Sequence, residues 1–256
     1  MSAWWIGCAL VVAVWTLLWL LSVWLRDVSI VDIAWGPGFI LMAGVALASS
    51  ADPGQRAWWA AGATALWGVR LSVHLALRAR GRGEDDRYAA MRQEHGDTFP
   101  LRSLVTVFWL QAILIAVLSA PIWTAVRSSG RLGPVGWVGV VLFGVGLAFE
   151  AVADGQLARF KKRAEEGREV LDTGLWRYSR HPNYFGEALL WWGFGLLGVD
   201  AGAWWTLLAS GAVTILVLKI SGVPLLEESL QERRPGYADY VRRTPAFVPW
   251  FPKSDG

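Results

Sequence analysis

The chain has one cysteine, Cys8, and only three histidines among its 256 residues. A single cysteine excludes a disulfide within the chain and any metal site built from several cysteines. The histidines, His74, His95 and His181, do not have the spacing of metal ligands. The N-terminus also lacks the basic segment of a cleavable signal peptide, and its first apolar run is long enough to stay in a membrane. We therefore expect no bound metal and no removed leader.

Apolar residues are abundant and lie in long runs. They make up 54% of the chain, which also contains 18 tryptophans. About 20 apolar residues in a helix cross a hydrocarbon core of roughly 30 Å. The runs are unbroken, whereas a membrane strand would alternate, so helices are expected. We predict an all-α, polytopic membrane helix bundle of about seven transmembrane helices, over residues 4–25, 28–48, 58–77, 104–126, 135–153, 184–199 and 204–220.

The cations are distributed unevenly between the connecting segments. With these spans, 20 of the 24 lysines and arginines lie on one side, and only Arg56, Arg127 and Arg131 lie on the other. Because the side with more cations is usually cytoplasmic, we expect the N-terminus outside and the C-terminus in the cytoplasm. We see no internal repeat and no linker, so residues 1–256 are predicted to form a single membrane domain.

One segment, from Gly174 to Glu187, gathers unusually many polar groups at the start of an apolar run. Pro182 suits the first turn of a helix, whose free N–H groups favour a phosphate. Arginine contacts phosphate well, and tyrosines stack on rings or hydrogen-bond to them. The alternative is an ordinary interfacial anchor. We predict a site for an anionic cofactor, formed here by Arg177, Tyr178, Arg180, His181, Asn183, Tyr184 and Glu187.

Two further sets of polar residues lie at membrane depth. Glu150, Asp154 and Lys161 are spaced for one helix face, and an acid at such a depth usually points into a bundle or a wet cavity. Asp32 and Arg70 lie in the second and third predicted spans. They form either a structural ion pair or a catalytic pair that polarises a substrate or donates a proton.

A Gly-x-Gly-x-x-Gly pattern occurs at Gly193, Gly195 and Gly198. It follows no predicted strand, so we do not interpret it as a dinucleotide fingerprint. Glycines inside an apolar helix let neighbouring helices approach closely. The same interpretation applies to Gly139, Gly144 and Gly146.

The Gly174–Glu187 stretch resembles the signature of the DUF1295 family, bacterial membrane proteins related to the steroid 5α-reductases. Four other motifs are similar to that group: Asp32-x-x-Trp35-Gly36, Glu84-Asp-x-Arg-Tyr88, Ala153-Asp-x-Gln156, and the tail from Gly222-x-Pro-Leu-Leu-Glu227 to Gly236-Tyr-x-x-Tyr240. The resemblance implies a seven-helix fold and an NADPH-dependent reduction of a C=C bond conjugated to a carbonyl in a lipophilic substrate, in a bacterial inner membrane.

The resemblance also implies where the cofactor binds. By position, the reductases' cofactor residues match Glu150, Asp154, Lys161, Asn183 and Glu187, with Tyr237 and Tyr240 of the tail, all in the half from about 135 to 256. The reductases hold the substrate carbonyl with a glutamate and a tyrosine. Asp32 stands in for the glutamate, but Trp67 lies near the tyrosine position. Steroid as the substrate is therefore left open.

Two rival functions remain. Arg180-His-Pro-x-Tyr184 is also similar to the motif with which isoprenylcysteine carboxyl methyltransferases bind S-adenosylmethionine. A non-enzymatic lipid-binding protein is the second rival, but it leaves the buried acids unexplained. The expected partners are the bilayer and a lipophilic small-molecule substrate, which suggests a role in lipid metabolism. We expect no nucleic-acid partner.

Overall fold

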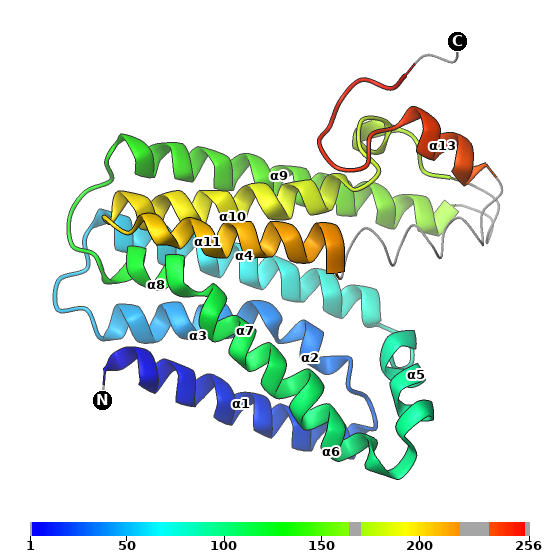
Figure 1. Ribbon diagram of the computed structural model, residues 1–256, viewed down its shortest axis with the longest axis horizontal. Helices are drawn as coiled ribbons and strands as arrows, with labels where there is room; N and C mark the ends of the chain where they lie inside the picture. Colours follow the sequence, from blue (N-terminus) through cyan, green and yellow to red (C-terminus); the bar gives the residue numbers. More distant parts are fainter. Residues whose placement is uncertain (1, 164–169, 221–235, 254–256) are drawn as a thin grey trace. The chain divides into compact units, whose positions relative to one another are not determined.

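The computed structural model describes residues 2–163, 170–220 and 236–253. Every regular element in that part of the chain is helical, which confirms the all-α class (Figure 1). The tail motif residues Gly222 to Glu227 lie outside the described residues. Contacts divide the chain into two compact units: unit 1 is Met1–Gly133 with Asp200–Ala203, and unit 2 is Pro134–Val199 with Trp204–Gly256. The predicted single domain stays a prediction.

Unit 1 contains the first eight helices, joined by two short irregular helical turns. Their bounds are α1 Ala3–Leu25, α2 Ile30–Ile33, α3 Trp35–Ala48, α4 Gln55–Ala79, α5 Asp86–His95, η1 Gly96–Thr98, α6 Phe99–Ser103, η2 Leu104–Trp109, α7 Leu110–Leu118 and α8 Ala120–Arg127. Unit 2 contains α9 Pro134–Arg163, η3 Gly174–Arg177, α10 Pro182–Asp200, η4 Trp204–Thr206, α11 Leu207–Ile215, η5 Leu216–Ile220 and α13 Tyr237–Arg243.

Four helical stretches of the described chain are long and apolar enough to cross a membrane. They are Ala3–Leu25, Gln55–Ala79, Asp86–Leu118 and Pro134–Arg163. Two shorter apolar helices cover Trp35–Ala48 and Trp204–Lys219. The structure thus supports a membrane protein with several spans. The number seven and the orientation of the termini stay predictions.

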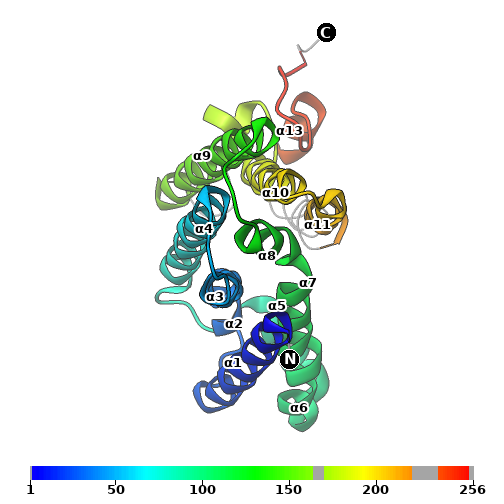
Figure 2. The ribbon, with the colours of Figure 1, turned by 90° about the vertical axis from the view of Figure 1, so that its left-hand side faces the viewer.

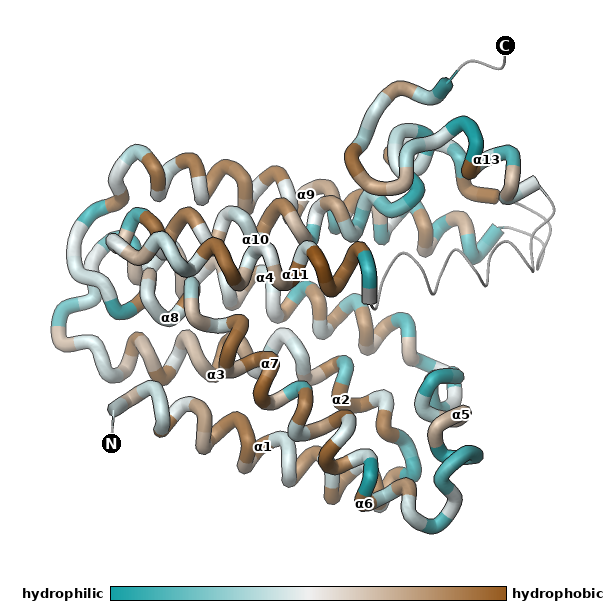
Figure 3. The backbone as a smooth tube through the Cα atoms, viewed as in Figure 1, coloured by the Kyte–Doolittle hydropathy of each residue, from teal (hydrophilic) through white to brown (hydrophobic). Residues whose placement is uncertain are grey.

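The outward side of α1 is apolar, as lipid contact requires. Its buried residues Gly7, Val11 and Trp15 recur every fourth position and form one stripe. Outside that stripe lie exposed leucines and tryptophans such as Leu17 and Trp24. Figure 3 shows this apolar character along α1 and α7, in contrast to the hydrophilic α5. Because water would not favour this surface, α1 fits a lipid-facing helix.

The join between the first two spans is tight, as the sequence indicates, but the second span is broken. Arg26 adopts a left-handed conformation with φ of 56° and ends α1 through an N–H bond to the carbonyl of Ser22. The short α2 follows and stops at Ala34, where α3 begins. Asp32 therefore lies on a separate helical turn and not within one continuous span.

The helix α3 lies at the centre of unit 1, in contact with α1, α4, α7 and α8 (Figure 2). It approaches α4 most closely at Gly36, where a Cβ atom would lie 2.3 Å from the carbonyl oxygen of Gly68. Next to this crossing the rings of Phe39 and Trp67 meet edge to face at 5.4 Å, and both are fully buried. Trp67 is thus a core residue of unit 1.

Glycines also set the packing of unit 2. A Cβ atom on Gly146 would lie 2.6 Å from the carbonyl oxygen of Gly186, and one on Gly193 would lie 2.6 Å from that of Gly139. On the other side of α10, Gly195 and Gly198 face the side chains of Ser210 and Thr206. The predicted packing role is confirmed at these positions. It is wrong for Gly144, where a Cβ atom would meet nothing within 4 Å.

Gly146 and Gly144 offer a matched test of this crossing. We expect Gly146→Ala to lower the melting temperature of the detergent-solubilised protein, because backbone atoms of α10 cannot move aside for a methyl group. Gly144→Ala should be neutral or stabilise by up to about 1 kcal/mol, since alanine favours a helix. Equal melting temperatures for the two variants would contradict the packing described.

Candidate functional site

The Gly146–Gly186 crossing brings the predicted acids and amide of unit 2 together. A Cβ atom on Gly186 would lie 2.6 Å from the backbone nitrogen of Glu150, so Glu150 lies directly against the first turns of α10. One turn further along α9, Asp154 accepts a hydrogen bond of 3.2 Å from Nδ2 of Asn183. Glu150 and Asp154 are only 5% and 7% exposed. Two carboxylates are therefore buried beside an amide.

Glu187 lies on α10 one turn after Asn183. It is half-buried, and its Oε1 accepts a hydrogen bond of 3.0 Å from Nε1 of Trp191. The structure thus brings Glu150, Asp154 and Asn183 together where α9 and α10 cross, with Glu187 one turn further along α10. We call these four residues the crossing cluster. Buried acids are costly, so their collection at one crossing indicates a site that binds hydrogen-bond donors.

Asn183 connects the crossing cluster to the start of α10. Its Oδ1 accepts from the backbone N–H of Tyr184 at 3.0 Å, while its Nδ2 serves Asp154. The ring of Tyr184 stacks on that of buried His181 at 5.5 Å, with the planes 5° apart. These contacts hold the first turn of α10 in one conformation.

Arg180 lies where α13 ends. Its guanidinium donates to the carbonyl oxygens of Val241, in the last turn of α13, at 3.0 Å and of Thr244, which caps that helix, at 2.7 Å. Its backbone N–H donates to the carbonyl of Pro245 at 2.9 Å. A cation at a helix C-terminus is favourable because of the helix dipole. Arg180 therefore holds the tail helix in place.

Tyr237 and Tyr240 are both buried within the tail assembly. Their rings lie 5.8 Å apart, and the hydroxyl of Tyr240 donates to the carbonyl of Trp176. Trp176 in turn donates from Nε1 to the carbonyl of Ala153 on α9, at 3.2 Å. The tail, η3 and α9 thus form one hydrogen-bonded wall.

Three predicted cofactor residues are exposed on this wall. They are Lys161, two turns beyond Asp154 on α9, and the neighbouring residues Arg177 and Tyr178 of η3. Within the described part of the chain, the guanidinium of Arg177 has no ion pair or hydrogen bond. Arg177 is therefore free to contact an anion, whereas Arg180 already serves α13.

In unit 1, Asp32 is the centre of a second polar cluster. Its Oδ1 accepts from the hydroxyl of Tyr88 at 2.8 Å and from Nε2 of Gln111 at 3.2 Å. Its Oδ2 pairs with Arg87 at 3.0 Å. The ionic partner of Asp32 is thus Arg87 of α5 and not Arg70, which lies half-buried on α4. The amide oxygen of Gln111 is buried and has no hydrogen-bond partner among the described residues.

Glu84 attaches the segment before α5 to the join between α1 and α2. Its carboxylate accepts from the N–H of Val28 at 2.9 Å and twice from Arg92, at 2.7 and 2.8 Å. Burial acts to raise the pKa of Glu84, but the hydrogen bonds from Arg92 and Val28 outweigh it and hold that pKa below its usual value. Asp32 on α2 is thereby held beside Tyr88.

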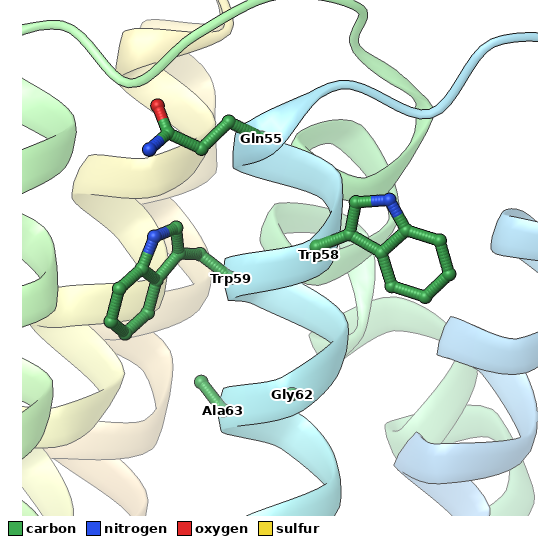
Figure 4. Close-up of a pocket in the computed structure, with 5 residues that line it drawn as sticks. All are labelled: Gln55, Trp58, Trp59, Gly62 and Ala63. Carbon is green, nitrogen blue, oxygen red and sulfur yellow. The ribbon is translucent and has the colours of Figure 1, made fainter.

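A separate open cavity lies along α4. Gln55, Trp58, Trp59, Gly62 and Ala63 line its roughly 320 Å³ (Figure 4). Its walls are mainly apolar and contain no titratable group. Chemistry that needs a charged or proton-donating side chain is therefore not expected there. Nor do the described residues include a group of three or more His, Cys, Asp or Glu side chains placed to hold a metal.

Several contacts in these clusters cannot be predicted from the sequence, because they join residues that lie far apart in the chain. Tyr88 and Gln111 are separated from Asp32 by 56 and 79 residues, and only the helix packing brings them together. The Glu84-Asp-x-Arg-Tyr88 motif was a usable signal, although it is also the pattern of a solvated helix cap. Gln111 has no such signal.

Comparisons with known proteins cover most of the chain. The sequence profile described as "Protein of unknown function (DUF1295)" matches residues 18–244. An uncharacterized protein, C594.04c, of Schizosaccharomyces pombe is 28% identical over 275 aligned positions, which cover 93% of this chain and 76% of the relative. The steroid 5-alpha-reductase DET2 of Solanum lycopersicum is 30% identical over 105 positions, 40% of each chain. The similarity to a named enzyme is thus partial.

The Glu84–Arg92 pair gives a pH prediction. A depressed pKa in the folded state means that the pair stabilises unit 1 above the unfolded pKa of about 4.3 and that this stability is lost as the pH falls through the folded pKa. At pH 7, Glu84→Gln should therefore lower the free energy of unfolding by about 1 kcal/mol and lower the melting temperature. The difference from the unmodified protein should shrink toward pH 4. Adding Arg92→Gln should cause little further loss. A difference that does not change with pH would contradict this.

Proposed function

Because the chain belongs to the DUF1295 family, we propose that it is a membrane reductase that uses NADPH to reduce a C=C bond conjugated to a carbonyl. The substrate is a lipophilic, steroid- or isoprenoid-like molecule. The observation that carries the proposal is the crossing cluster, in which buried carboxylates and an amide meet at one helix crossing. The partial similarity to a steroid 5-alpha-reductase supports the reaction class. We place the enzyme in a bacterial inner membrane.

The residues of unit 2 suit a phosphorylated nucleotide. Carboxylates accept hydrogen bonds from ribose hydroxyls and from a carboxamide, which assigns the uncharged parts to Glu150, Asp154 and Glu187. Arg177 and Lys161 are exposed cations, and such groups suit phosphates, including the 2′-phosphate of NADPH. Tyr178, the exposed neighbour of Arg177, and Tyr184, which stacks on His181, supply aromatic rings. Arg180, His181, Asn183, Tyr237 and Tyr240 act in this proposal chiefly by holding the wall in shape.

The reduction adds a hydride to one alkene carbon and a proton to the other, so that the C=C π pair ends in two C–H bonds. NADPH, when bound, supplies the hydride. We assign Arg70 to the substrate carbonyl, since a guanidinium only donates hydrogen bonds. We assign the proton to the hydroxyl of Tyr88, which becomes a phenolate and regains a proton from water, while Asp32, 2.8 Å from that hydroxyl, holds it in position. Arg87 on the far oxygen of Asp32 offsets negative charge left on the phenol.

Tyr88 is also our candidate for the role of the tyrosine that the reductases use and that this chain lacks at the corresponding position. Trp67, near the position that the resemblance implies, is part of the core of unit 1 and has no exposure to a substrate. Tyr88 is instead the tyrosine that lies on the acid Asp32. We therefore propose that this pair performs the role of the reductases' acid and tyrosine, with a different geometry. That difference leaves the identity of the lipophile open.

Cofactor choice is tested by ligand-induced stabilisation. We expect NADPH at about 100 times its Kd to stabilise the purified protein by about 2.7 kcal/mol and to raise its melting temperature. S-adenosylmethionine should have no effect. Stabilisation by S-adenosylmethionine alone would favour the methyltransferase, and no shift with either ligand would favour a lipid-binding protein without enzymatic activity.

Variants of the crossing cluster locate the site. Asn183→Ala removes the donor to Asp154, and Glu187→Ala removes a carboxylate, so each should weaken NADPH binding about ten-fold or more. Binding is read by titration of the melting shift. Asp172→Asn, an exposed acid of the same unit outside the cluster, should leave the affinity unchanged. Unchanged affinity in both cluster variants, with normal folding, would remove this assignment.

A further inference from the structure

The last described segment of unit 2 exposes large apolar side chains. Val248, Trp250 and Phe251 are 59%, 70% and 74% exposed. We call these three residues the tail edge. Large apolar side chains gathered on a polar, extramembrane part of a protein mark a contact surface more often than chance.

Hydrogen bonds and a ring contact hold the tail edge against the rest of unit 2. The N–H of Trp250 donates to the carbonyl of Tyr178 at 2.9 Å, and the N–H of Lys253 donates to that of Arg243 at 2.9 Å. Upstream, Ser179 donates from Oγ to the carbonyl of Phe247 at 2.8 Å. The ring of Phe251 meets that of Tyr178 edge to face at 6.0 Å. The folded wall therefore presents these aromatic side chains outward in a fixed place.

Cations surround the tail edge. Arg177 precedes Tyr178, and Arg242 and Lys253 flank the edge from α13 and from its own end; all three are exposed. Among the described residues, Asp239 pairs with Arg242, and Asp172 lies 3.7 Å from Arg243. With Arg243 included, four described cations accompany these two acids, so the described part of the surroundings is net positive. An aromatic edge with a positive border is complementary to anionic lipid headgroups.

The helix α9 gives the level of this edge relative to a bilayer. It begins at Pro134, and the wall attaches to it at Ala153, through Trp176. Nineteen residues of helix rise about 29 Å, which is close to the ~30 Å thickness of the hydrocarbon core. The exposed Trp137 marks the other end. The attachment therefore lies where α9 leaves the hydrocarbon, the level that interfacial tryptophans occupy.

We propose that the tail edge docks into the headgroup region of an anionic bilayer surface, with Trp250 and Phe251 inserted and with Arg242 and Lys253 on lipid phosphates. This inference does not depend on the reductase activity. It assigns a function to a segment that the crossing cluster does not use. It also gives the wall a second support, on the membrane as well as on α9.

The full chain in nanodiscs tests the proposal, using Cys8→Ser to remove the one cysteine. An environment-sensitive fluorophore is placed on Trp250→Cys, with Phe251→Cys as a second variant should the first fold poorly. Thr173→Cys, an exposed polar position of the same unit, is the control. In discs containing phosphatidylglycerol, spin-labelled lipids should quench both edge labels strongly and the control weakly.

Charge is tested on the same labelled proteins. In discs of phosphatidylcholine alone, or after Arg242→Gln with Lys253→Gln, the contact should weaken about five-fold or more. Quenching of the edge labels no greater than that of Thr173→Cys would overturn the proposal. Shielding of the labels without lipid quenching would overturn it in favour of a protein partner. Equal quenching in discs with and without phosphatidylglycerol would overturn the preference for anionic lipid.

Discussion

The contact of α9 with α10 at Gly146 and Gly186 is the constraint on which unit 2 depends. Backbone atoms of the two helices touch there, and a Cβ atom on either glycine would lie within 2.6 Å of the other helix. So close a contact fixes both the rotation and the depth of each helix. Glu150 is placed by its backbone against Gly186, and Asp154 and Asn183 then meet one turn away. A site with buried acids needs this rigidity, since a carboxylate that can reach water has no reason to remain inside.

Unit 1 combines the close contact of Gly36 with Gly68 with charge pairs that hold its connecting segments. Arg56 near the start of α4 bonds Asp200 at 2.8 Å and also donates to Ser128 and the carbonyl of Arg131. Glu84 does the same for the join between α1 and α2. Breaking the Arg56–Asp200 pair, whose side chains are only 11% and 7% exposed, would leave an uncompensated charge and be strongly destabilising. These pairs therefore fix the loops, and one of those loops leads into α5, which places Tyr88 beside Asp32.

The sequence predicts what depends on local pattern. Apolar runs gave the helical class and the end of α1 at Leu25, and the glycine pattern of α10 gave its close packing. It fails where the third dimension decides. Gly144 and Gly146 look alike in the sequence, but only Gly146 faces α10. The break at Ala34, by contrast, has a local cause, because Pro37 lacks the N–H that would bond the carbonyl of Ile33 four residues earlier. Asp32 has several cations within reach of a plausible fold, and only the packing of α5 selects Arg87.

Arg180 shows how a motif can be found correctly and its residues still be given different tasks. Composition groups Arg177 and Arg180 as equal phosphate ligands, three positions apart. The structure distinguishes them. The guanidinium of Arg180 donates to two carbonyls at the C-terminal end of α13, whereas Arg177 is exposed. Carbonyls at a helix end hold a guanidinium at little cost, and a bound anion would have to displace them. The cation assigned to an anion is therefore Arg177, whose guanidinium, among the described residues, makes no hydrogen bond or ion pair that holds the fold together. A wall held by Arg180 and Tyr240 can present such a cation in a fixed place, which an isolated basic loop cannot do.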